Sequence, residues 1–297
     1  PDGSLGPLYL AAALEAAGYE TDVLDASIGT ADDDLKDTFY RRTMQENGRI
    51  RLGMTSARMG EVIAKGGYDI VGISSNFTPQ TRMAFEVART AKAVSSEILV
   101  IAGGVNARAM ANRFLECGCI DAVCLTEGER IIVNVARAWE KSKDLSAVSG
   151  IARLHNGAVV RQPVVPSDIC QDLDDLPLPA WEKLVFKHYE MIASPHQILC
   201  PEKERYVPVM TSRGCWAACL YCHISHEKKH RGQNGGIGSL RFKSIDRVMA
   251  EVEKLQSLGA RKLYFEDDTL LFDKERIGGI FKQVRGKGFT IADVNGV

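Results

Sequence analysis

The pattern of hydrophobic and polar positions predicts a chain in which short strands alternate with helices. Residues 5–17 are hydrophobic on almost every side, as in a buried helix, and Gly18 can end that helix. Short runs rich in β-branched residues predict strands over 20–25, 69–75, 98–102 and 122–125. Polar, helix-prone segments follow the last three of these runs. Because strands and helices alternate, the sequence predicts an α/β fold with parallel strands.

The same alternation returns in the last third of the chain. Further strands are predicted over 207–210, 262–265 and 290–294. Helices are predicted to begin after Ser244 and Asp273, because both residue types suit an N-cap. The intervening stretch 226–239 (HEKKHRGQNGGIGS) is basic and then glycine-rich, and it predicts a solvated loop. Arg231 within this stretch and Arg241 and Lys243 after it are candidates to meet a carboxylate or a phosphate.

The middle of the chain predicts a hairpin and a connector. Asn156–Gly157 between two hydrophobic runs is a strong signal for a two-residue hairpin turn. Residues 172–184 (DLDDLPLPAWEKL) are rich in Asp and Pro, as in a linker. The scattered residues His188, His196, Cys170 and Cys200 are interpreted as structural.

Three cysteines stand between the strand over 207–210 and the next helical segment. Cys215, Cys219 and Cys222 have the spacing C-x3-C-x2-C. Three thiolates on so short a loop can converge on one inorganic centre, and a cubane iron–sulfur cluster takes four. One iron would keep an open position, which a catalytic metal centre needs and a structural one lacks.

Two other interpretations of these cysteines remain open. A zinc site would use them with His223, His226 or His230, although zinc sites favour paired Cys and His spacings. A disulfide with one spare thiol fits less well, because no secretory segment is visible.

The cysteine spacing, with Tyr221 just before the last cysteine, resembles the radical S-adenosylmethionine (SAM) enzymes. The resemblance implies a 4Fe–4S cluster on Cys215, Cys219 and Cys222 whose open iron chelates SAM. One electron then cleaves SAM to methionine and a 5′-deoxyadenosyl radical. It also implies a small-molecule substrate and an electron donor such as flavodoxin or ferredoxin.

Polar residues at the ends of the next two strands are candidates for binding SAM. In the family, such residues after the second barrel strand bind the methionine amino group, and Glu266, Asp267 and Asp268 stand there. A carboxylate suits an ammonium group through charge-assisted hydrogen bonds. Tyr221 and Asn295 are further candidates by the same resemblance, and a solvated acidic loop is the alternative.

Three loops in the first half are candidates for a larger ligand, because parallel sheets bind ligands at the carboxyl ends of their strands. The order of pieces over residues 3–140 resembles the cobalamin-binding domain that precedes the barrel in many radical SAM enzymes. The implied cobalamin-binding residues are Ser74, Ser75, Asn76, Phe77, Gly103, Gly104, Val105, Asn106, Thr126, Glu127 and Gly128.

The histidine that ligates cobalt from below in the methionine-synthase type is not present in this domain. The first histidine of the sequence is His155, outside the predicted domain. Cys117, Cys119 and Cys124 are possible ligands by residue type, but free buried cysteine usually behaves as a small hydrophobic residue.

Together these features predict a Rossmann-like, doubly wound cobalamin-binding domain followed by a partial radical SAM (β/α) barrel. The expected division is residues 1–145 for the cobalamin domain, 146–205 for hairpin and linker, and 206–297 for the barrel part. We expect the chain to be a fragment at both ends, because 206–297 hold about two and a half βα units and the first cobalamin-domain strand is missing.

The most probable activity by this resemblance is methyl transfer to an unactivated centre by way of methylcobalamin. The rival within the class is a cyclase or rearrangement enzyme like the anaerobic porphyrin cyclases. The rival outside it is a cobalamin sensor or carrier without catalysis, which would leave the three cysteines unexplained. A methylthiotransferase acting on transfer RNA fits less well.

Composition and charge limit the class of protein and the cellular location that the sequence predicts. Hydrophobic residues make up 45% and charged residues 25% of the 297 positions, as in ordinary globular proteins. The net charge of −1 gives no field that favours nucleic acid. No hydrophobic run approaches the roughly 20 residues of a membrane span. Eight cysteines without a visible export signal predict a cytoplasmic protein.

Overall fold

The computed structural model describes residues 4–45, 48–192, 204–293 and 295. The chain forms two compact units, each assembled from separate segments. Unit 1 contains residues 1–53, 171–225 and 238–297, and unit 2 contains 54–170 and 226–237. This division differs from the boundaries predicted at 145 and 205. The predicted His196 and Cys200 lie outside the described residues.

Unit 2 is built on a mixed five-stranded sheet with the order β3-β4-β5-β6-β7. The parallel strands are β3 (Ile70–Ser74), β4 (Leu99–Gly103) and β5 (Ala122–Cys124). The antiparallel strands β6 (Ile151–His155) and β7 (Ala158–Arg161) complete it. The three predicted parallel strands are therefore confirmed, and their carboxyl ends share one edge of the sheet.

The predicted hairpin turn joins β6 to β7. Asn156 and Gly157 have φ values of 51° and 78°. Two consecutive residues with positive φ form the turn type whose twist matches that of the flanking strands. His155 pairs directly with Ala158 across the turn, as this geometry requires.

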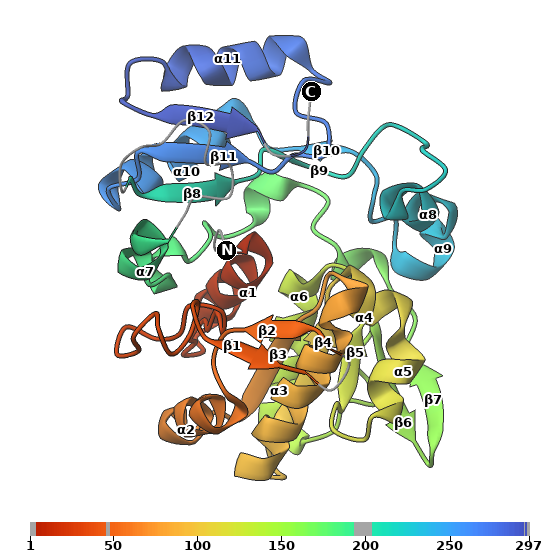
Figure 1. Cartoon of the computed structure of the whole chain (residues 1–297). Coiled ribbons are helices and arrows are strands. Elements are labelled where there is room, and N and C mark those ends of the chain that lie inside the picture. The colour runs from red at the N-terminus through yellow and green to blue at the C-terminus, as the bar shows by residue number, and fades with distance from the viewer. Residues whose placement is uncertain (1–3, 46–47, 193–203, 294, 296–297) are drawn as a thin grey trace. The chain divides into compact units, whose positions relative to one another are not determined.

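Helices precede, connect and follow the parallel strands of unit 2. They are α2 (Ser56–Gly66), α3 (Thr81–Val94, after the 3₁₀ turn Thr78–Gln80), α4 (Val105–Ala109), α5 (Ala111–Glu116) and α6 (Gly128–Ser142). Figure 1 shows α3 running along β3 and β4, against which it packs. Small residues on α3 make this close approach possible, because Ala84, Ala88 and Ala91 are all buried.

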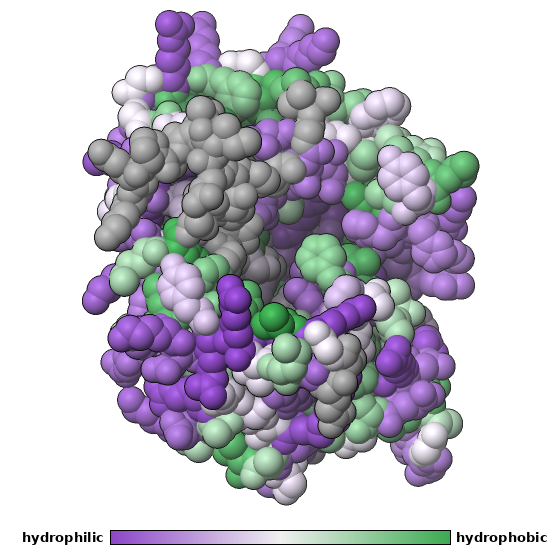
Figure 2. Space-filling view, in the orientation of Figure 1, coloured by the Kyte–Doolittle hydropathy of each residue, from purple (hydrophilic) through white to green (hydrophobic). Residues whose placement is uncertain are grey.

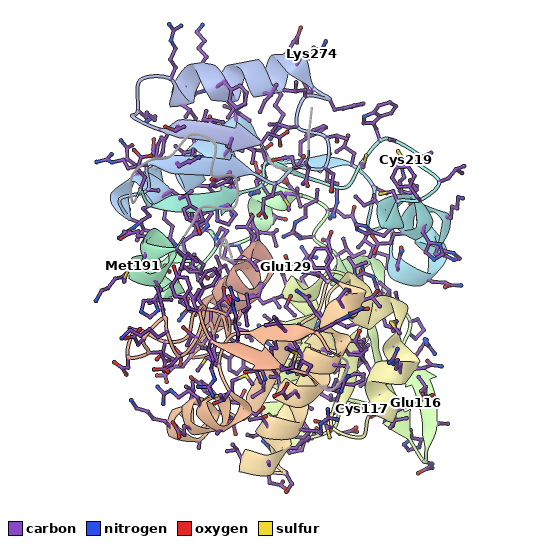
Figure 3. The ribbon with its side chains drawn as sticks, viewed as in Figure 1. Glu116, Cys117, Glu129, Met191, Cys219 and Lys274 are labelled. Carbon is purple, nitrogen blue, oxygen red and sulfur yellow. The ribbon has the colours of Figure 1, made fainter. Side chains whose placement is uncertain are left out.

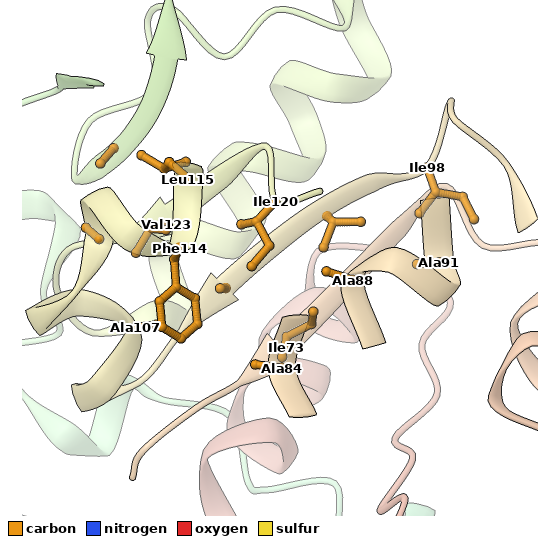
Figure 4. Close-up of a cluster of buried hydrophobic side chains, with 14 of the residues drawn as sticks. Ile73, Ala84, Ala88, Ala91, Ile98, Ala107, Phe114, Leu115, Ile120 and Val123 are labelled. Atoms are coloured by element: carbon orange, nitrogen blue, oxygen red, sulfur yellow. The ribbon is translucent and has the colours of Figure 1, made fainter. Parts of the chain in front are cut away.

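One hydrophobic core lies between these helices and the sheet. Ile73, Ile98 and Val123 come from the strands or their ends, and Phe114 and Leu115 come from α5. Figure 4 shows these side chains converging with the alanines of α3. Burial of hydrophobic side chains at about 25 cal/mol per Å² is the main force that holds this layer together.

Unit 1 contains a three-stranded parallel sheet with the order β12-β11-β8. Its strands are β8 (Tyr206–Val209), β11 (Lys262–Phe265) and β12 (Thr290–Asp293). The sheet is open in the part of the chain that the structure describes, so the predicted partial barrel is present only as these three strands. A short antiparallel pair, β9 (Ser212–Arg213) with β10 (Arg241–Phe242), follows the end of β8.

The helices of unit 1 come from both ends of the sequence. They are α1 (Leu5–Ala16), α7 (Phe186–Met191), α10 (Ile245–Ser257) and α11 (Lys274–Val284), and the hairpin β1 (Arg42–Met44) and β2 (Ile50–Leu52) belongs to the same unit. The predicted N-caps are confirmed: the Ser244 and Asp273 side chains accept hydrogen bonds from the backbone N–H of Arg247 and Arg276. A core of Ile28, Tyr189, Tyr206 and Tyr264 joins the first residues to the sheet.

The strand predicted over residues 20–25 does not form. A strand needs a neighbouring strand to receive its backbone hydrogen bonds, and in the described part of the chain no strand pairs with this segment, which side chains contact instead. Lys183 Nζ donates to the carbonyl oxygen of Thr21, and Tyr189 OH donates to Asp25 at 2.8 Å. The hydrophobic pattern over residues 20–25 predicted their partial burial correctly, but it did not predict that they lack a neighbouring strand.

The basic stretch predicted as a solvated loop is helical instead. Helix α8 spans His223–Lys229 and α9 spans Arg231–Asn234. Gly235, with φ of 72°, ends α9 in the left-handed conformation that glycine adopts most readily. Glu227 forms an ion pair with Arg108, and Asn234 O accepts a hydrogen bond from Thr126 Oγ1, contacts that a free loop would not make.

Among the described residues, the structure contains no helix that is both long and hydrophobic enough to cross a bilayer. Hydrophilic side chains cover much of the molecular face shown in Figure 2, with hydrophobic groups scattered between them.

Candidate functional site

The three cysteines lie on one loop between β9 and α8 in unit 1. Cys219 is exposed, whereas Cys215 and Cys222 are partly buried. The Cys215 N–H donates to Gly238 O at 3.2 Å, and the Cys222 N–H donates to Cys219 O at 3.2 Å. Figure 3 shows Cys219 on the loop that leads into α8.

Gly214 fixes the start of this loop. Its φ is 81°, and a Cβ atom there would lie 2.4 Å from Ser239 O. Only glycine fits so close to another backbone segment at positive φ. The loop therefore leaves the sheet in a defined direction, with Cys215 immediately after this contact.

The thiols fit an iron–sulfur cluster in number and chemistry. In the described part of the chain, no three His, Cys, Asp or Glu side chains are gathered as around a single metal ion. A cubane places each cysteine on a different iron, so its ligands need not meet at one point. Three cysteines on a single loop could therefore supply three of the four ligands of such a cluster and leave one iron open.

The acidic end of β11 lies beside this loop's strand. Strand β11 pairs with β8 on one side and β12 on the other, with Phe265 opposite both Val209 and Asp293. The segments after all three strands therefore leave the same edge of the sheet. Asn295 Nδ2 donates to Glu266 O at 3.0 Å and to Asp267 O at 3.4 Å, so the structure brings the predicted SAM candidates of β11 and β12 together.

Asp267 has a different environment from its neighbours, because its carboxylate accepts hydrogen bonds from within the protein. The side chain is completely buried and accepts hydrogen bonds from Thr211 N–H and Oγ1 and from Ser212 Oγ. Arg276 donates in turn to Thr211 O at 2.7 Å, and burial lowers the pKa of Arg276, opposed by the Asp267 charge. These contacts give Asp267 a structural role at the strand ends, which its sequence position alone did not reveal.

Tyr221 is 94% exposed on the cysteine loop. Nearby on the same unit, the Trp216 ring lies 5.8 Å from Phe272, and Phe272 stacks on Phe242 at 6.3 Å. These aromatic residues border the cysteine loop, and the motif-based prediction passed over Trp216 and Phe272.

Two of the predicted cobalamin loops in unit 2 are bonded directly to each other. Asn106 N–H donates to Ser75 O at 3.1 Å, and Asn106 Nδ2 donates to Ser75 Oγ and Thr81 Oγ1, each at 2.9 Å. Val105 N–H donates to Asn76 Oδ1 at 3.4 Å. Gly104 makes the approach possible, because a Cβ there would lie 2.6 Å from Ser75 O.

One buried polar atom in these loops has no protein partner. Asn106 is 4% exposed, and its Oδ1 makes no hydrogen bond with the described residues. An unpaired buried acceptor is costly, and a ligand that donates hydrogen bonds at this edge would satisfy it. The side-chain amides that surround a corrin ring are such donors.

The remaining predicted cobalamin residues flank these contacts. Ser74 and Gly103 end β3 and β4, Phe77 is 66% exposed, Glu127 is the N-cap residue of α6, and Gly128 is its first residue. Thr126 is buried, and its Oγ1 donates to Asn234 O at 2.8 Å.

The other candidate ligands have structural surroundings. Cys117 and Cys119 pack against the core of unit 2. Burial raises the pKa of Cys124 to about 11, so this thiol stays protonated at neutral pH. In unit 1, His188 is buried with Nδ1 3.1 Å from Ile28 O. Cys170 is also buried.

Lys243 meets a carboxylate, as its sequence position allowed. Its Nζ donates to both oxygens of Glu251 at 2.7 Å and to Tyr9 OH at 2.6 Å, and it is almost completely buried. This group links α1 to the segment before α10. A lysine so deeply buried is recognisable only from the structure.

Residues 3–136 match the B12 binding domain family. Uncharacterized methyltransferase PH0819 of Pyrococcus horikoshii is 29% identical over 243 residues, covering 80% of this chain and 48% of that protein. Cytidylyl-2-hydroxyethylphosphonate methyltransferase of Streptomyces wedmorensis is 27% identical, covering 98% of this chain and 56% of that protein.

Anaerobic magnesium-protoporphyrin IX monomethyl ester cyclase of Cereibacter sphaeroides is 28% identical over 63% of this chain and 28% of that protein. The chain thus spans about half the length, or less, of these curated relatives.

A solved structure of the radical S-adenosylmethionine methyltransferase TsrM from Kitasatospora setae, with tryptophan and a SAM analog bound, has the same fold. The TM-score is 0.67 at 17% identity, covering 96% of this chain and 48% of that one. Residues 3–136 are thus similar to the B12 binding domain family, the chain is similar to these methyltransferases and to the cyclase, and its fold matches that of TsrM.

Proposed function

We propose that this protein is a radical SAM methyltransferase that uses an iron–sulfur cluster and cobalamin to methylate an unactivated centre of a small molecule. The observation that carries the proposal is that one chain combines a match to the B12 binding domain family with a loop that carries three cysteines at C-x3-C-x2-C spacing. Neither feature alone would suggest both cofactors.

Cys215, Cys219 and Cys222 would hold the cluster as thiolates. Gly214 and the Cys215 N–H bond to Gly238 set where the loop starts. When bound, the reduced cluster supplies the electron that cleaves SAM, and cobalamin carries the methyl group. An electron donor such as flavodoxin or ferredoxin is part of the proposal.

Residues at the sheet edge of unit 1 would bind and orient SAM. Glu266 and Asp268 offer carboxylates to its ammonium group, and Asn295 fixes the segment that carries them through its bond to Glu266 O. Tyr221 offers an exposed aromatic ring. Asp267 would act through Thr211 and Ser212 rather than by touching SAM.

The loops after β3, β4 and β5 would bind cobalamin. Ser75, Asn106 and Thr81 form one hydrogen-bonded group, and the unpaired Asn106 Oδ1 is available to accept a bond from a corrin amide. The close packing of Gly104 on Ser75 leaves backbone rather than side chains facing a ligand.

The test supplies SAM with a deuterated methyl group to the reduced, cofactor-loaded chain under anaerobic conditions. We expect both 5′-deoxyadenosine and S-adenosylhomocysteine, with one of each per methyl group transferred when a substrate is present. Omitting cobalamin should abolish S-adenosylhomocysteine and leave 5′-deoxyadenosine. Absence of S-adenosylhomocysteine from the fully loaded protein would contradict methyl transfer.

Ring closure or rearrangement is the second candidate, and the similarity to the Cereibacter sphaeroides cyclase favours it. The same experiment separates the two. A cyclase would form 5′-deoxyadenosine without S-adenosylhomocysteine, and its product would carry no deuterium from the methyl group.

A further inference from the structure

An aromatic stack in unit 1 joins the cysteine loop to the segment after β11, and the proposed chemistry does not yet use it. The centroid of the Trp216 ring lies 5.8 Å from that of Phe272, with an angle of 32° between the rings. Phe272 in turn stacks on Phe242 of β10 at 6.3 Å and 17°. All three residues belong to unit 1, so the stack is internal to one compact unit.

The guanidinium group of Arg276 supports the inner end of this stack. Its Cζ atom lies 5.0 Å from the centre of the Phe242 ring, a position at which a cation is attracted to an aromatic face. Arg276 Nε donates to Lys243 O at 2.9 Å, and Nη2 donates to Thr211 O at 2.7 Å. Because the planar guanidinium bonds to the backbone before β9 and after β10, its orientation is fixed. The stack therefore rests on a rigid base.

The outer end of the stack borders the first cysteine of the loop. Trp216 directly follows Cys215, whose N–H donates to Gly238 O at 3.2 Å. The Ala217 N–H donates to Cys215 Sγ at 3.4 Å. Trp216 is thus the middle residue of a turn in which the backbone already directs an N–H group at the sulfur. Hydrogen bonds to cysteine sulfurs are among the features by which a protein sets the reduction potential of an iron–sulfur cluster.

The three cysteines differ in how the structure holds them. Cys215 follows Gly214, whose backbone packs closely against Ser239 O, so the chain on both sides of Cys215 contacts elements outside the loop. The Cys222 N–H donates to Cys219 O, three residues earlier in the same loop, and Cys219 is exposed. Contacts to distant segments restrain a residue more than contacts within a mobile loop do.

We propose that Trp216 and Phe272 are positioning residues for the iron–sulfur cluster, and that their stacked rings make Cys215 the preformed ligand of the three. The stack holds the turn after Cys215 closed, with its N–H group on the sulfur that binds iron. This inference rests on the proposed function, because it assigns a cluster to the loop. Iron leaves when the turn opens, so removal of the stack raises the rate of iron loss without preventing assembly.

Removal of one ring from the stack tests the inference. Trp216→Leu and Phe272→Leu keep a hydrophobic side chain but lose the stacking, whereas Trp216→Phe keeps a ring. Each full-length variant is reconstituted anaerobically with iron and sulfide, and iron release to a chelator is timed. Both leucine variants should release iron about two- to tenfold faster than the wild type, the factor that corresponds to the roughly 0.5–1.5 kcal/mol of an aromatic pair. Trp216→Phe should stay close to the wild-type rate.

Amide hydrogen exchange before reconstitution provides a readout that needs no cluster. The Ala217 N–H should exchange about two- to tenfold faster in both leucine variants, and Trp216→Phe should restore the slower rate. The Cys222 N–H, which bonds within the loop, should keep its wild-type rate in every variant. If the wild type assembles no cluster, the proposed function fails, but this exchange pattern still decides whether the stack holds the turn.

Leu220 supplies the matched control, because it is a large hydrophobic residue on the same loop and is 94% exposed. Leu220→Ala should leave both the iron release and the Ala217 exchange at the wild-type rates. The inference is overturned if the leucine variants at Trp216 and Phe272 keep those rates, or if Trp216→Phe releases iron as fast as Trp216→Leu. Equal acceleration of the Ala217 and Cys222 amides would also overturn it, since that result indicates general destabilisation of the loop.

Discussion

At the scale of single residues, the three cysteine thiols carry the sharpest prediction. Changing Cys215, Cys219 or Cys222 to Ala should remove the bound iron and sulfide and abolish SAM cleavage, because a cluster held by three thiolates loses a ligand. Iron and sulfide assays after anaerobic reconstitution measure the cluster content of each variant. Cys119→Ala is the matched control, since that thiol packs against the core of unit 2. Full cluster content in all three variants would remove the basis of the assignment.

The buried lysine predicts a dependence of stability on pH. Burial lowers the pKa of Lys243 from 10.5 to about 8. Between these values the unfolded chain binds more protons than the folded chain, so the free energy of unfolding rises with pH through this window. The rise would be up to about 3 kcal/mol. Urea unfolding at pH 7.5, 9 and 10 should show this rise in the free energy of unfolding for the wild type but not for Lys243→Met. The same dependence on pH in both proteins would contradict the prediction.

The acidic residues after β11 can be separated by their roles. Asp267→Asn should lower the free energy of unfolding by about 1–3 kcal/mol, because Thr211 and Ser212 lose part of a buried acceptor. Glu266→Gln should weaken SAM binding with little change in stability. Equilibrium binding of SAM and urea unfolding of both variants measure the two effects. A stable Asp267→Asn variant that no longer binds SAM would assign Asp267 to the ligand after all.

At the scale of elements, the turn between β4 and α4 is the most constrained segment of the cobalamin edge. Gly104→Ala should cost about 1–3 kcal/mol of stability and abolish cobalamin binding, because its φ is 95° and the new Cβ would collide with Ser75. Gly118→Ala is the control, with a φ of 75° but open space around the Cβ. Its cobalamin binding, followed by absorbance, should stay at the wild-type level.

Elements with a strong local pattern could be predicted from the sequence, and elements decided by distant partners could not. The strands over β3, β4 and β11, the Asn156–Gly157 turn and the Ser244 cap depend on nearby residues and were confirmed. The segment over 20–25 has a strand-like pattern, but no strand in the described part of the chain pairs with it, and Lys183, 162 residues later in the sequence, donates to Thr21 O instead. Helices α8 and α9 depend on Arg108 and Thr126, more than 100 residues earlier.

The features of the candidate site also fall into those that the sequence reveals and those that only the structure reveals. The three cysteines and the strand-end loops are visible because their spacing and position carry the signal. The buried environment of Asp267 and the ion pair of Arg108 with Glu227 are not visible, because neither the burial of a carboxylate nor the partner of an arginine is encoded near them in sequence.

At the scale of the whole molecule, the two compact units do not follow the order of the sequence. Residues 1–53 join the sheet of unit 1 through Ile28 and Leu35, which pack with Tyr206 and Tyr264. A sequence pattern places a domain boundary where the composition changes. The compact units depend instead on which segments pack against each other in the folded protein. The family match over residues 3–136 therefore crosses from one unit into the other.

The distribution of histidines over the whole chain predicts the state of bound cobalt. All six histidines lie at position 155 or later, outside the residues that match the B12-binding family. The Cys124 thiol is buried, and it would contribute sulfur rather than nitrogen to a metal. We therefore expect no nitrogen atom from this domain below the cobalt. Electron paramagnetic resonance of the cob(II)alamin form should show no nitrogen hyperfine splitting from a lower ligand. Labelling the histidines with ¹⁵N supplies the control: a splitting that changed with the label would identify a histidine ligand and contradict the prediction.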